Sequence, residues 1–399
     1  MAQIENRGQN KNGSWSFRIK IFTGRDVEGK RTFLSDTFVG EPSWSEKTTK
    51  KKAEAYASNL ERDYKNGIVP DKKYTFHDYA LMIISQREQT GIIKYTTAER
   101  YRDSVSKTDK YIGSIKLGDL RPDHLDQMYA DMLSSKNQIT GKPISKSTVH
   151  EHHTMVRMVL NNAYKKGLVP INVADRATPP SREKAEILYY TEEEAKQILN
   201  CFEAEPIKWK LIVNLLLISG IRKGELCGLK WENVNFEKKT IYICNQVQYD
   251  TKRGLFEETP KTKKSIRTIM LPDGIMQMMR EYKAYQNGER LRLGEYFVNQ
   301  GFVFTQDNGE PLHPDSINHE FLKMEKKYNL PHLRPHSFRH TMATHLFANG
   351  NMDVVTVSAR LGHAQPSTTM NIYAHAIPSK DEECSELLGN LFFKAENMT

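Results

Sequence analysis

Six side chains suited to phosphoryl chemistry stand in four short segments of the C-terminal half of this 399-residue chain. Arginine binds a phosphate through a bidentate fork, lysine adds a positive charge, and histidine exchanges protons near neutral pH. A tyrosine hydroxyl attacks phosphorus when nearby cations help it to ionise. Together such groups orient a phosphodiester and stabilise the charge of its reaction. The segments SGIRKGEL, PKTKKSIR, HSFRHTMATHL and LGHAQPSTTMNIYAH carry them, at Arg222, Lys261, His336, Arg339, His363 and Tyr373.

The local sequence predicts where these side chains stand. Arg222 follows a glycine at or near a helix start, and Lys261 lies in a turn before a strand. His336 and Arg339 are three residues apart, which places them on one helix face. They lie at the N-terminal end of that helix, where free backbone N–H groups favour an anion. We expect Glu225 to orient the site as a structural partner and not to act as an acid.

Simpler interpretations exist for the same residues. A helical tyrosine such as Tyr373 is most often a packed aromatic side chain, and Arg339 could form a surface ion pair. Lys263 and Lys264 are alternatives to Lys261 in the lysine role, because all three lie in one basic stretch. The other five matched residues favour a chemical role for the tyrosine.

A zinc site is a further alternative. His336 and His340 are four residues apart, the spacing of a helical zinc pair. Ser337 stands where a zinc hydrolase would carry a glutamate. We therefore disfavour the metal interpretation and expect His340 and His345 to pack or to cap.

The four segments resemble the boxes of the tyrosine recombinase (phage-type integrase) family. SGIRKGEL is similar to its first arginine box, and PKTKKSIR to its lysine hairpin. HSFRHTMATHL is similar to its His-x-x-Arg box, and LGHAQPSTTMNIYAH to its final segment with the tyrosine. Ile221 and Phe338 stand where the family commonly has leucine, and neither is a catalytic position.

The resemblance implies a mechanism, residue by residue. Tyr373 is the nucleophile, and Lys261 is the acid for the leaving 5′-hydroxyl. The two arginines bind the scissile phosphate, and His336 and His363 assist. Cleavage proceeds through a covalent 3′-phosphotyrosine link without metal or nucleotide cofactor. The expected function is site-specific recombination that integrates and excises a phage or another mobile element.

Hydrophobic patterning predicts a multidomain α+β protein. Residues 14–40 alternate as strands, and a helix follows from Thr48 or Thr49, which makes a small sheet-plus-helix domain over 1–67. Residues 74–172 have helical periodicity throughout. Residues 185–399 read as a mainly α domain with a small antiparallel sheet. The resemblance implies an arm-type DNA-binding domain with a three-stranded sheet, a SAM-like core-binding domain, and the catalytic domain with its C-terminal tail.

The excess of positive charge lies in the first two of these parts. Residues 1–75 hold 15 Lys/Arg against 10 Asp/Glu, and residues 76–180 hold 15 against 11. Residues 181–399 hold 28 of each. Such a bias suits DNA, although a solvated basic surface explains charge alone equally well. A strand ribbon can enter the major groove, so the polar strand face is a candidate DNA reader, with Arg18, Lys20 and Arg31 on it.

The same features predict partners and location. The polar start and the short apolar runs predict a cytoplasmic protein acting on DNA. The scattered cysteines predict free thiols. The resemblance implies double-stranded DNA with core and arm attachment sites, and a homotetramer on synapsed DNA. A directionality factor and a host DNA-bending protein are possible further partners. The apolar tail either caps its own domain or docks on a neighbouring protomer, through Leu387, Leu388, Leu391, Phe392 and Phe393.

Two other functions remain at this point. One is a non-catalytic, sequence-specific DNA-binding protein on the same fold, which would not need Arg222, Arg339 and Tyr373 together. The other is a type IB topoisomerase or a hairpin-forming resolvase, which shares the tyrosine chemistry. The arm-like N-terminal segment favours an integrase over both enzymes.

Overall fold

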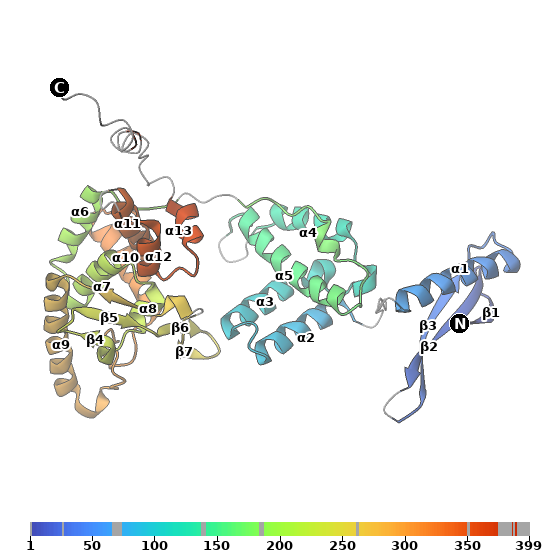
Figure 1. Ribbon diagram of the computed structural model, residues 1–399, viewed down its shortest axis with the longest axis horizontal. Helices are drawn as coiled ribbons and strands as arrows, with labels where there is room; N and C mark the ends of the chain where they lie inside the picture. The colour runs from blue at the N-terminus through green and yellow to red at the C-terminus, as the bar shows by residue number, and fades with distance from the viewer. Residues whose placement is uncertain are drawn as a thin grey trace, which may run out of the picture. The chain divides into compact units, whose positions relative to one another are not determined.

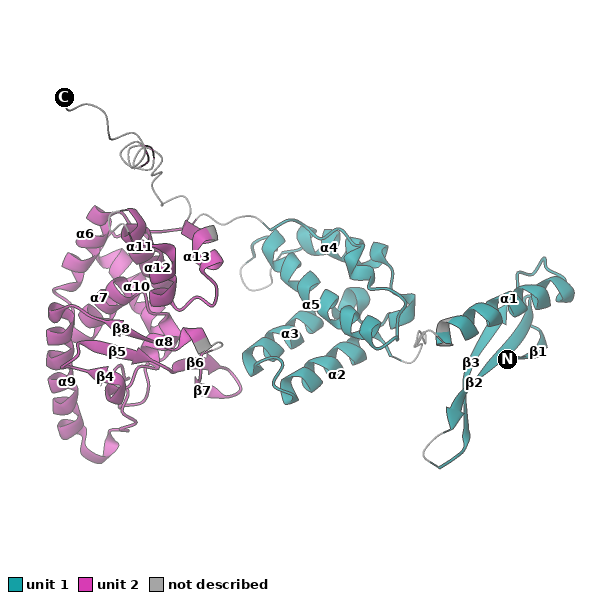
Figure 2. Ribbon diagram, in the orientation of Figure 1, with its two compact units in different colours: residues 1–184 teal, residues 185–399 magenta. Residues whose placement is uncertain are grey.

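A computed structural model gives the fold of the chain. It describes residues 2–25, 28–65, 74–136, 141–182, 187–260, 263–348 and 352–373, together with the single residues 385 and 388. The chain divides into two compact units, residues 1–184 and 185–399, shown in different colours in Figure 2. Helices and sheets are both present, and the predicted multidomain α+β class is confirmed.

The chain begins with an antiparallel sheet of order β1-β2-β3, on which one helix packs (Figure 1). Phe17, Ile19 and Ile21 alternate along the central strand and are buried, and the two isoleucines share a core with Ala57 and Leu60 of the helix. The elements are β1 (Gln3–Gln9), β2 (Trp15–Arg25), β3 (Arg31–Val39) and α1 (Glu46–Lys65).

Two details of this segment differ from expectation. β1 lies in a polar stretch without apolar alternation, so sequence patterning gave no strand signal there. α1 begins at Glu46, earlier than the expected start at Thr48 or Thr49. The Ser45 hydroxyl accepts from the backbone N–H of Thr48 at 3.2 Å and provides the cap.

A helical bundle follows, as the periodicity predicts. Its elements are α2 (Phe76–Gln89), α3 (Tyr95–Thr108), α4 (Pro122–Ser134) and α5 (Lys146–Lys165) (Figure 1). Thr75 and Ser145 cap α2 and α5 through side-chain oxygens, which explains where these helices begin. The helices enclose an apolar core of their own, which includes Phe76, Ile83 and Val156.

The second unit is mainly helical. Its apolar helix α7 (Ile207–Ser219) lies in the core and packs on α9 (Asp273–Leu293) and α11 (Pro335–Ala348). The remaining helices surround this centre: α6 (Glu192–Phe202), α8 (Lys223–Cys227), α10 (Pro314–Tyr328), α12 (Val354–Leu361) and α13 (Pro366–Tyr373). Hydrophobic patterning of the sequence predicts helices near 273–286, 315–328, 336–348, 352–360 and 366–374, and these correspond to α9 to α13.

The predicted small antiparallel sheet of this unit is present as two sheets. One has the order β4-β5-β8, and the other pairs β6 with β7. The strands are β4 (Val234–Asn235), β5 (Thr240–Ile243), β6 (Gln246–Asp250), β7 (Gly254–Glu258) and β8 (Arg267–Met270). Within the described ranges, no helix has both the length and the apolar character needed to cross a bilayer.

Candidate active site

Arg222 is held where the buried helix α7 gives way to the short helix α8. Gly220 ends α7 in a left-handed conformation with φ of 61°, and a Cβ atom there would stand 2.2 Å from Met342 Cε. Arg222 is the N-cap residue of α8. Its Nη1 donates to Glu225 Oε1 at 2.7 Å, and its backbone N–H donates to Glu225 Oε2 at 3.1 Å. The turn therefore fixes the arginine and its carboxylate partner together.

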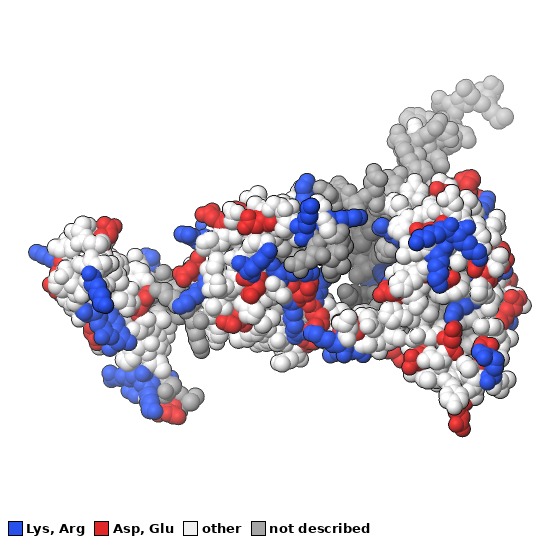
Figure 3. Space-filling view, turned by 180° about the vertical axis from the view of Figure 1, so that it is seen from behind, with Lys and Arg blue, Asp and Glu red and all other residues white. Residues whose placement is uncertain are grey.

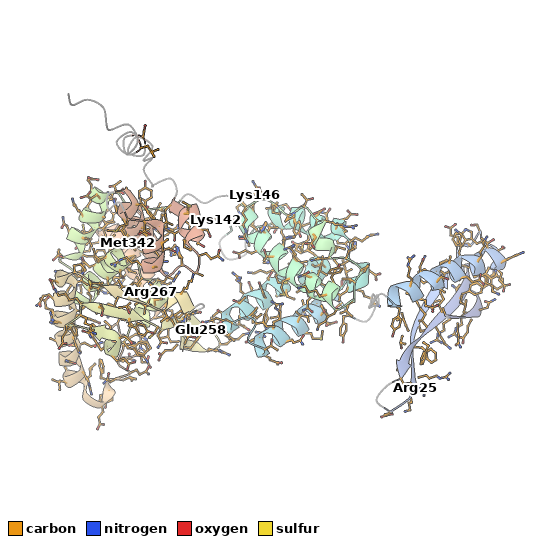
Figure 4. All side chains as sticks on the ribbon, in the orientation of Figure 1. Arg25, Lys142, Lys146, Glu258, Arg267 and Met342 are labelled. Carbon is orange, nitrogen blue, oxygen red and sulfur yellow. The ribbon has the colours of Figure 1, made fainter. Side chains whose placement is uncertain are left out.

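Glu225 joins this arginine to a second one from a distant strand. Arg267, labelled in Figure 4, is buried on β8 and donates from Nη2 to Glu225 Oε2 at 2.9 Å. It also donates to the carbonyl oxygens of Arg360 at 2.7 Å and Ser265 at 3.0 Å. Burial acts to raise the pKa of Glu225, but the charges of Arg267 and Arg222 hold it below its ordinary value. The carboxylate thus stays ionised between two guanidinium groups.

Arg339 is almost completely buried in the site. It is 1% exposed and donates from Nη1 to the Gly220 carbonyl at 2.7 Å and from Nη2 to the Leu361 carbonyl at 2.6 Å. Burial, followed by the charge of Arg222, lowers its pKa to about 9, so it remains cationic at neutral pH. The side chain connects the C-terminal ends of α7 and α12.

The two predicted histidines are neutral at neutral pH. Burial, followed by the charge of Arg339, lowers the pKa of His336 and lowers that of His363 to about 4. His363 Nδ1 is 2.7 Å from Thr369 Oγ1. His363 follows Gly362, whose left-handed conformation ends α12. Neutral imidazoles can give or take a proton, as the predicted assisting roles require.

Tyr373 is fully buried at the end of α13. Its ring packs in an apolar cluster that includes Met342, Phe347 and Leu361. Its Oη atom is 2.6 Å from His340 Nδ1. Burial raises the pKa of Tyr373 to about 12, and the charge of Arg339 acts in the opposite direction. The tyrosine is therefore a protonated phenol, close enough to Arg339 to feel its charge.

The structure brings five of the predicted residues into one region of the second unit. The charge of Arg339 acts to lower the pKa values of His336, His363 and Tyr373, so these side chains lie near it. Arg222 Nη2 donates to the Gly362 carbonyl at 3.5 Å. Lys261, the sixth, lies outside the described residues, so its role stays a prediction. Its alternative Lys264 stands, exposed, in the short helix over residues 263–265.

Sequence reasoning missed two participants. Arg267 falls inside the segment matched to the lysine hairpin, but nothing in its local spacing points to Glu225. His340 was expected to pack or to cap; its ring packs against those of His336 and Tyr373, and its Nδ1 also contacts the hydroxyl of Tyr373. Its one available signal was the four-residue step from His336, which places both rings on one helix face. Among the described residues, no cluster of three or more His, Cys, Asp or Glu is arranged to hold a metal ion.

The three predicted DNA-contacting residues stand on the face of the N-terminal sheet opposite its buried residues. Arg18 Nε donates to Ser35 Oγ at 3.0 Å, and Lys20 pairs with Glu5 at 2.8 Å. Arg31 is exposed at the start of β3, at the end of the strand pair that Arg25 marks in Figure 4. Lys and Arg side chains gather along this part of the chain in Figure 3. Contact with DNA remains a prediction for these residues.

Comparisons with known proteins find related families and proteins over most of the chain. The model of the phage integrase family matches residues 189–380, and that of the phage integrase SAM-like domain matches residues 75–178. A tyrosine recombinase XerC-like protein of Caldanaerobacter subterraneus subsp. tengcongensis is 28% identical, over 96% of this chain and 98% of its own length. The ICEBs1 integrase of Bacillus subtilis is 23% identical, over 71% of this chain and 77% of its own.

Solved structures share the fold. The Tn1549 transposon integrase, in complex with a circular intermediate DNA, has a TM-score of 0.64 and 22% identity, covering 79% of this chain and 98% of that one. A lambda integrase tetramer bound to a Holliday junction has a TM-score of 0.53 and 16% identity, covering 94% of this chain and 96% of that one. At these identities the likeness concerns the fold alone.

Proposed function

This chain belongs to the phage integrase family of tyrosine recombinases, and we propose that Tyr373 is the nucleophile with which it cuts DNA. It is a site-specific recombinase that cuts and rejoins DNA strands through a covalent 3′-phosphotyrosine intermediate, as an integrase of a mobile element. One observation carries the assignment of the nucleophile. Tyr373 Oη lies 2.6 Å from His340 Nδ1 of α11, within the influence of the Arg339 charge.

Arg222 and Arg339 bind the scissile phosphate in this proposal. A guanidinium has five N–H donors, and the two carbonyl contacts of Arg339 leave donors over. The side chain of Arg222 is 35% exposed, so it can meet a phosphate from solvent while Glu225 holds its other edge. A pentacoordinate phosphorus gains negative charge, which two fixed cations stabilise without reorganising. His336 and His363 assist from the same side, and Lys261 gives the leaving 5′-oxygen its proton.

The N-terminal parts bind DNA away from the reaction. We assign residues 1–67 to arm sites and 74–172 to core sites, with 185–399 as the catalytic domain. The exposed basic face of the first sheet supports the arm assignment. A circular intermediate DNA is the partner in the solved complex of the Tn1549 transposon integrase, to which the fold is similar. The protein then works in the bacterial cytoplasm, and a directionality factor and a host DNA-bending protein join it on the arm sites.

Removing the basic side chains of the sheet will weaken arm binding selectively. In the variant Arg18→Gln, Lys20→Gln, Arg31→Gln, each lost phosphate contact reduces the slope of log K against log salt by about 0.9. We therefore expect a slope smaller by about 2–3 on arm DNA and an unchanged affinity for core DNA. Fluorescence anisotropy at several salt concentrations measures both. Lys196→Gln, at an exposed lysine of α6, is the matched control, and an unchanged slope in the triple variant would refute the assignment.

We further propose that the C-terminal tail docks on a neighbouring protomer within a tetramer. The second unit has a groove of about 690 Å³, largely apolar, which Leu199, Leu217, Ile218, Leu346 and Val357 line. It suits the apolar tail residues between 387 and 393. The tail lies outside the described residues, apart from Ser385 and Leu388.

Deleting residues 381–399 will abolish assembled synapses and leave binding to a single site intact. The deletion removes the segment that occupies the groove of the neighbouring protomer. It leaves the DNA-contacting residues in place. Native gels with one labelled site and with two sites separate the two effects. Synapsis at the wild-type level after the deletion would show that the tail only caps its own domain.

A covalent trapping assay tests the function itself. A nicked duplex that spans an attachment site, taken from DNA beside the gene, releases a short fragment after cleavage and prevents rejoining. In the presence of chelator, a denaturant-resistant adduct that carries the 5′-labelled strand indicates a 3′-phosphotyrosine link. Tight and specific binding without any adduct would instead favour the non-catalytic DNA-binding protein.

A further inference from the structure

A histidine that the mechanism above does not use contacts the hydroxyl of Tyr373. His340 Nδ1 lies 2.6 Å from Tyr373 Oη, within hydrogen-bonding distance for an O–H donor. The two residues are 33 positions apart and come from α11 and α13. His340 stands four residues after His336, and the two rings meet edge to face with centroids 4.7 Å apart. The contact thus places an imidazole against the tyrosine hydroxyl and beside His336.

The surroundings determine which atom carries the proton. Burial, followed by the neighbouring His336 and Arg339, lowers the pKa of His340 to about 4, so its imidazole is neutral at neutral pH. Tyr373 is protonated, since burial raises its pKa to about 12. The pair is satisfied when the phenol donates its O–H to an unprotonated Nδ1 and the imidazole proton stays on Nε2.

Two other groups of the site are less well placed to take this proton. His363 Nδ1 is engaged with Thr369 Oγ1 at 2.7 Å. Arg339 is a donor only and gives its N–H groups to two backbone carbonyls. Within the described part of the chain, His340 is the residue found hydrogen-bonded to Tyr373 Oη.

We propose that His340 is a catalytic residue that positions Tyr373 and accepts its proton during attack on DNA. This inference rests on the proposed function, in which Tyr373 is the nucleophile. As the Oη–P bond forms, the Oη–H bond breaks and the proton moves to Nδ1. The P–O5′ bond breaks at the same centre, and O5′ leaves with a proton from Lys261. Rejoining runs the same transfers in reverse, because the 5′-hydroxyl then attacks and Tyr373 recovers its proton from His340.

DNA itself prepares the histidine for this role. A phosphodiester held by Arg222 and Arg339 brings negative charge close to the imidazole, and negative charge stabilises the imidazolium form. The basicity of His340 therefore rises when the phosphate is in place, toward the range in which a general base is effective. Without DNA, the same histidine leaves the phenol protonated and unreactive.

Substrates with two different leaving groups can show whether His340 acts on the nucleophile or on the leaving oxygen. The assay compares a nicked attachment-site duplex that has an ordinary 5′-oxygen with one that has a 5′-bridging sulfur at the scissile phosphate. A thiolate leaves without help from an acid, so the sulfur substrate restores variants that lack the acid. The full-length chain is used throughout, and rates of adduct formation are measured at saturating protein.

We expect His340→Asn to form adduct at least ~100-fold more slowly than wild type with both leaving groups. Asparagine keeps a hydrogen-bond acceptor near the position of Nδ1 but cannot take a proton, so it distinguishes proton transfer from positioning. His340→Ala loses both functions and falls at least as far. Lys261→Ala is slow with oxygen and restored with sulfur, and DNA affinity is unchanged in all three variants.

His345→Asn is the matched control, because it alters another half-buried histidine of α11 that bonds to the Tyr190 carbonyl at 3.1 Å. It should stay within ~3-fold of the wild-type rate. A wild-type rate for His340→Asn would overturn the proton transfer, and its restoration by sulfur would move the role to the leaving group. If wild type itself forms no adduct with either substrate, the proposed function falls, and this inference falls with it.

Discussion

Replacing Tyr373 with phenylalanine will abolish the covalent protein–DNA adduct and leave DNA binding at the wild-type level. The substitution removes the attacking oxygen and keeps the ring that packs beside Phe347, with centroids 5.8 Å apart. No neighbouring hydroxyl can replace a nucleophile at one fixed phosphate, so we expect adduct formation to fall on the order of 10⁴-fold or more. Trapping on the nicked duplex measures the adduct, and a gel shift on the intact site measures binding.

Tyr190→Phe is a matched control for this result. Tyr190 is also a buried tyrosine of the second unit, and its hydroxyl donates to the His332 carbonyl at 3.0 Å. Each substitution removes a buried hydroxyl and leaves a partner unsatisfied, at a cost of roughly 1–3 kcal/mol in the free energy of unfolding. The two variants should therefore lose similar stability, and Tyr190→Phe alone should keep its adduct. An adduct in Tyr373→Phe would mean that another side chain attacks the DNA.

Replacing Glu225 with alanine will destabilise the second unit by roughly 3–5 kcal/mol, the range found when one partner of a buried ion pair is removed. The carboxylate is 2% exposed and separates the guanidinium groups of Arg222 and Arg267. Without it, Arg267 remains buried with only backbone carbonyls for partners. The scissile phosphate would also meet a misplaced Arg222, so adduct formation should fall together with stability.

Tryptophan fluorescence can assign this loss to the correct unit. In a background that carries Trp15→Phe and Trp44→Phe, the remaining Trp209 and Trp231 report on residues 185–399. Urea unfolding then gives the change in the free energy of unfolding for Glu225→Ala, and the exposed control Glu237→Ala provides the comparison. Glu225→Gln keeps the shape of the side chain and loses its charge, so its free energy of unfolding should lie between those of the other two variants. Equal midpoints for Glu225→Ala and Glu237→Ala would contradict the network.

The pH dependence of this effect follows from the pKa of Glu225. The folded protein holds that pKa below the ordinary value of 4.5, so the stabilisation is complete above that value. It is lost as the pH falls through the lowered pKa of the folded state. The difference between wild type and Glu225→Ala should therefore shrink in acid and stay constant from pH 6 to 8.

Local signals predicted the scaffold well. The Thr191 hydroxyl accepts from the backbone N–H of Glu194, three residues later, which marks the start of α6. A left-handed Gly362 ends α12, and Pro366 opens α13. Such signals act within a few residues, so the sequence alone contains them. The polar strand β1 has no comparable signal, because it gains its place by pairing with β2.

The fine structure of the site depends on long-range contacts that local patterns do not contain. Glu225 and Arg267 are 42 residues apart, and His340 and Tyr373 are 33 apart. Each pair meets only because separate helices and strands pack on one core. Resemblance to a family supplied the side chains that we propose for the reaction. It gave no role to His340, whose importance appears only when α11 and α13 lie side by side.

The anchoring of the arginines on backbone oxygens bears on how this enzyme can evolve. Arg339 and Arg267 bind the main-chain carbonyls of Gly220, Leu361 and Arg360. A carbonyl is present whatever side chain its residue has, so a mutation at position 360 or 361 does not by itself remove an acceptor, although Leu361 also fills the apolar cluster around Tyr373. The main demand on these turns is their backbone path, which Gly220 and Gly362 maintain in left-handed conformations. Laboratory selection for new target sequences can therefore vary the DNA-facing surface widely while the active site is retained.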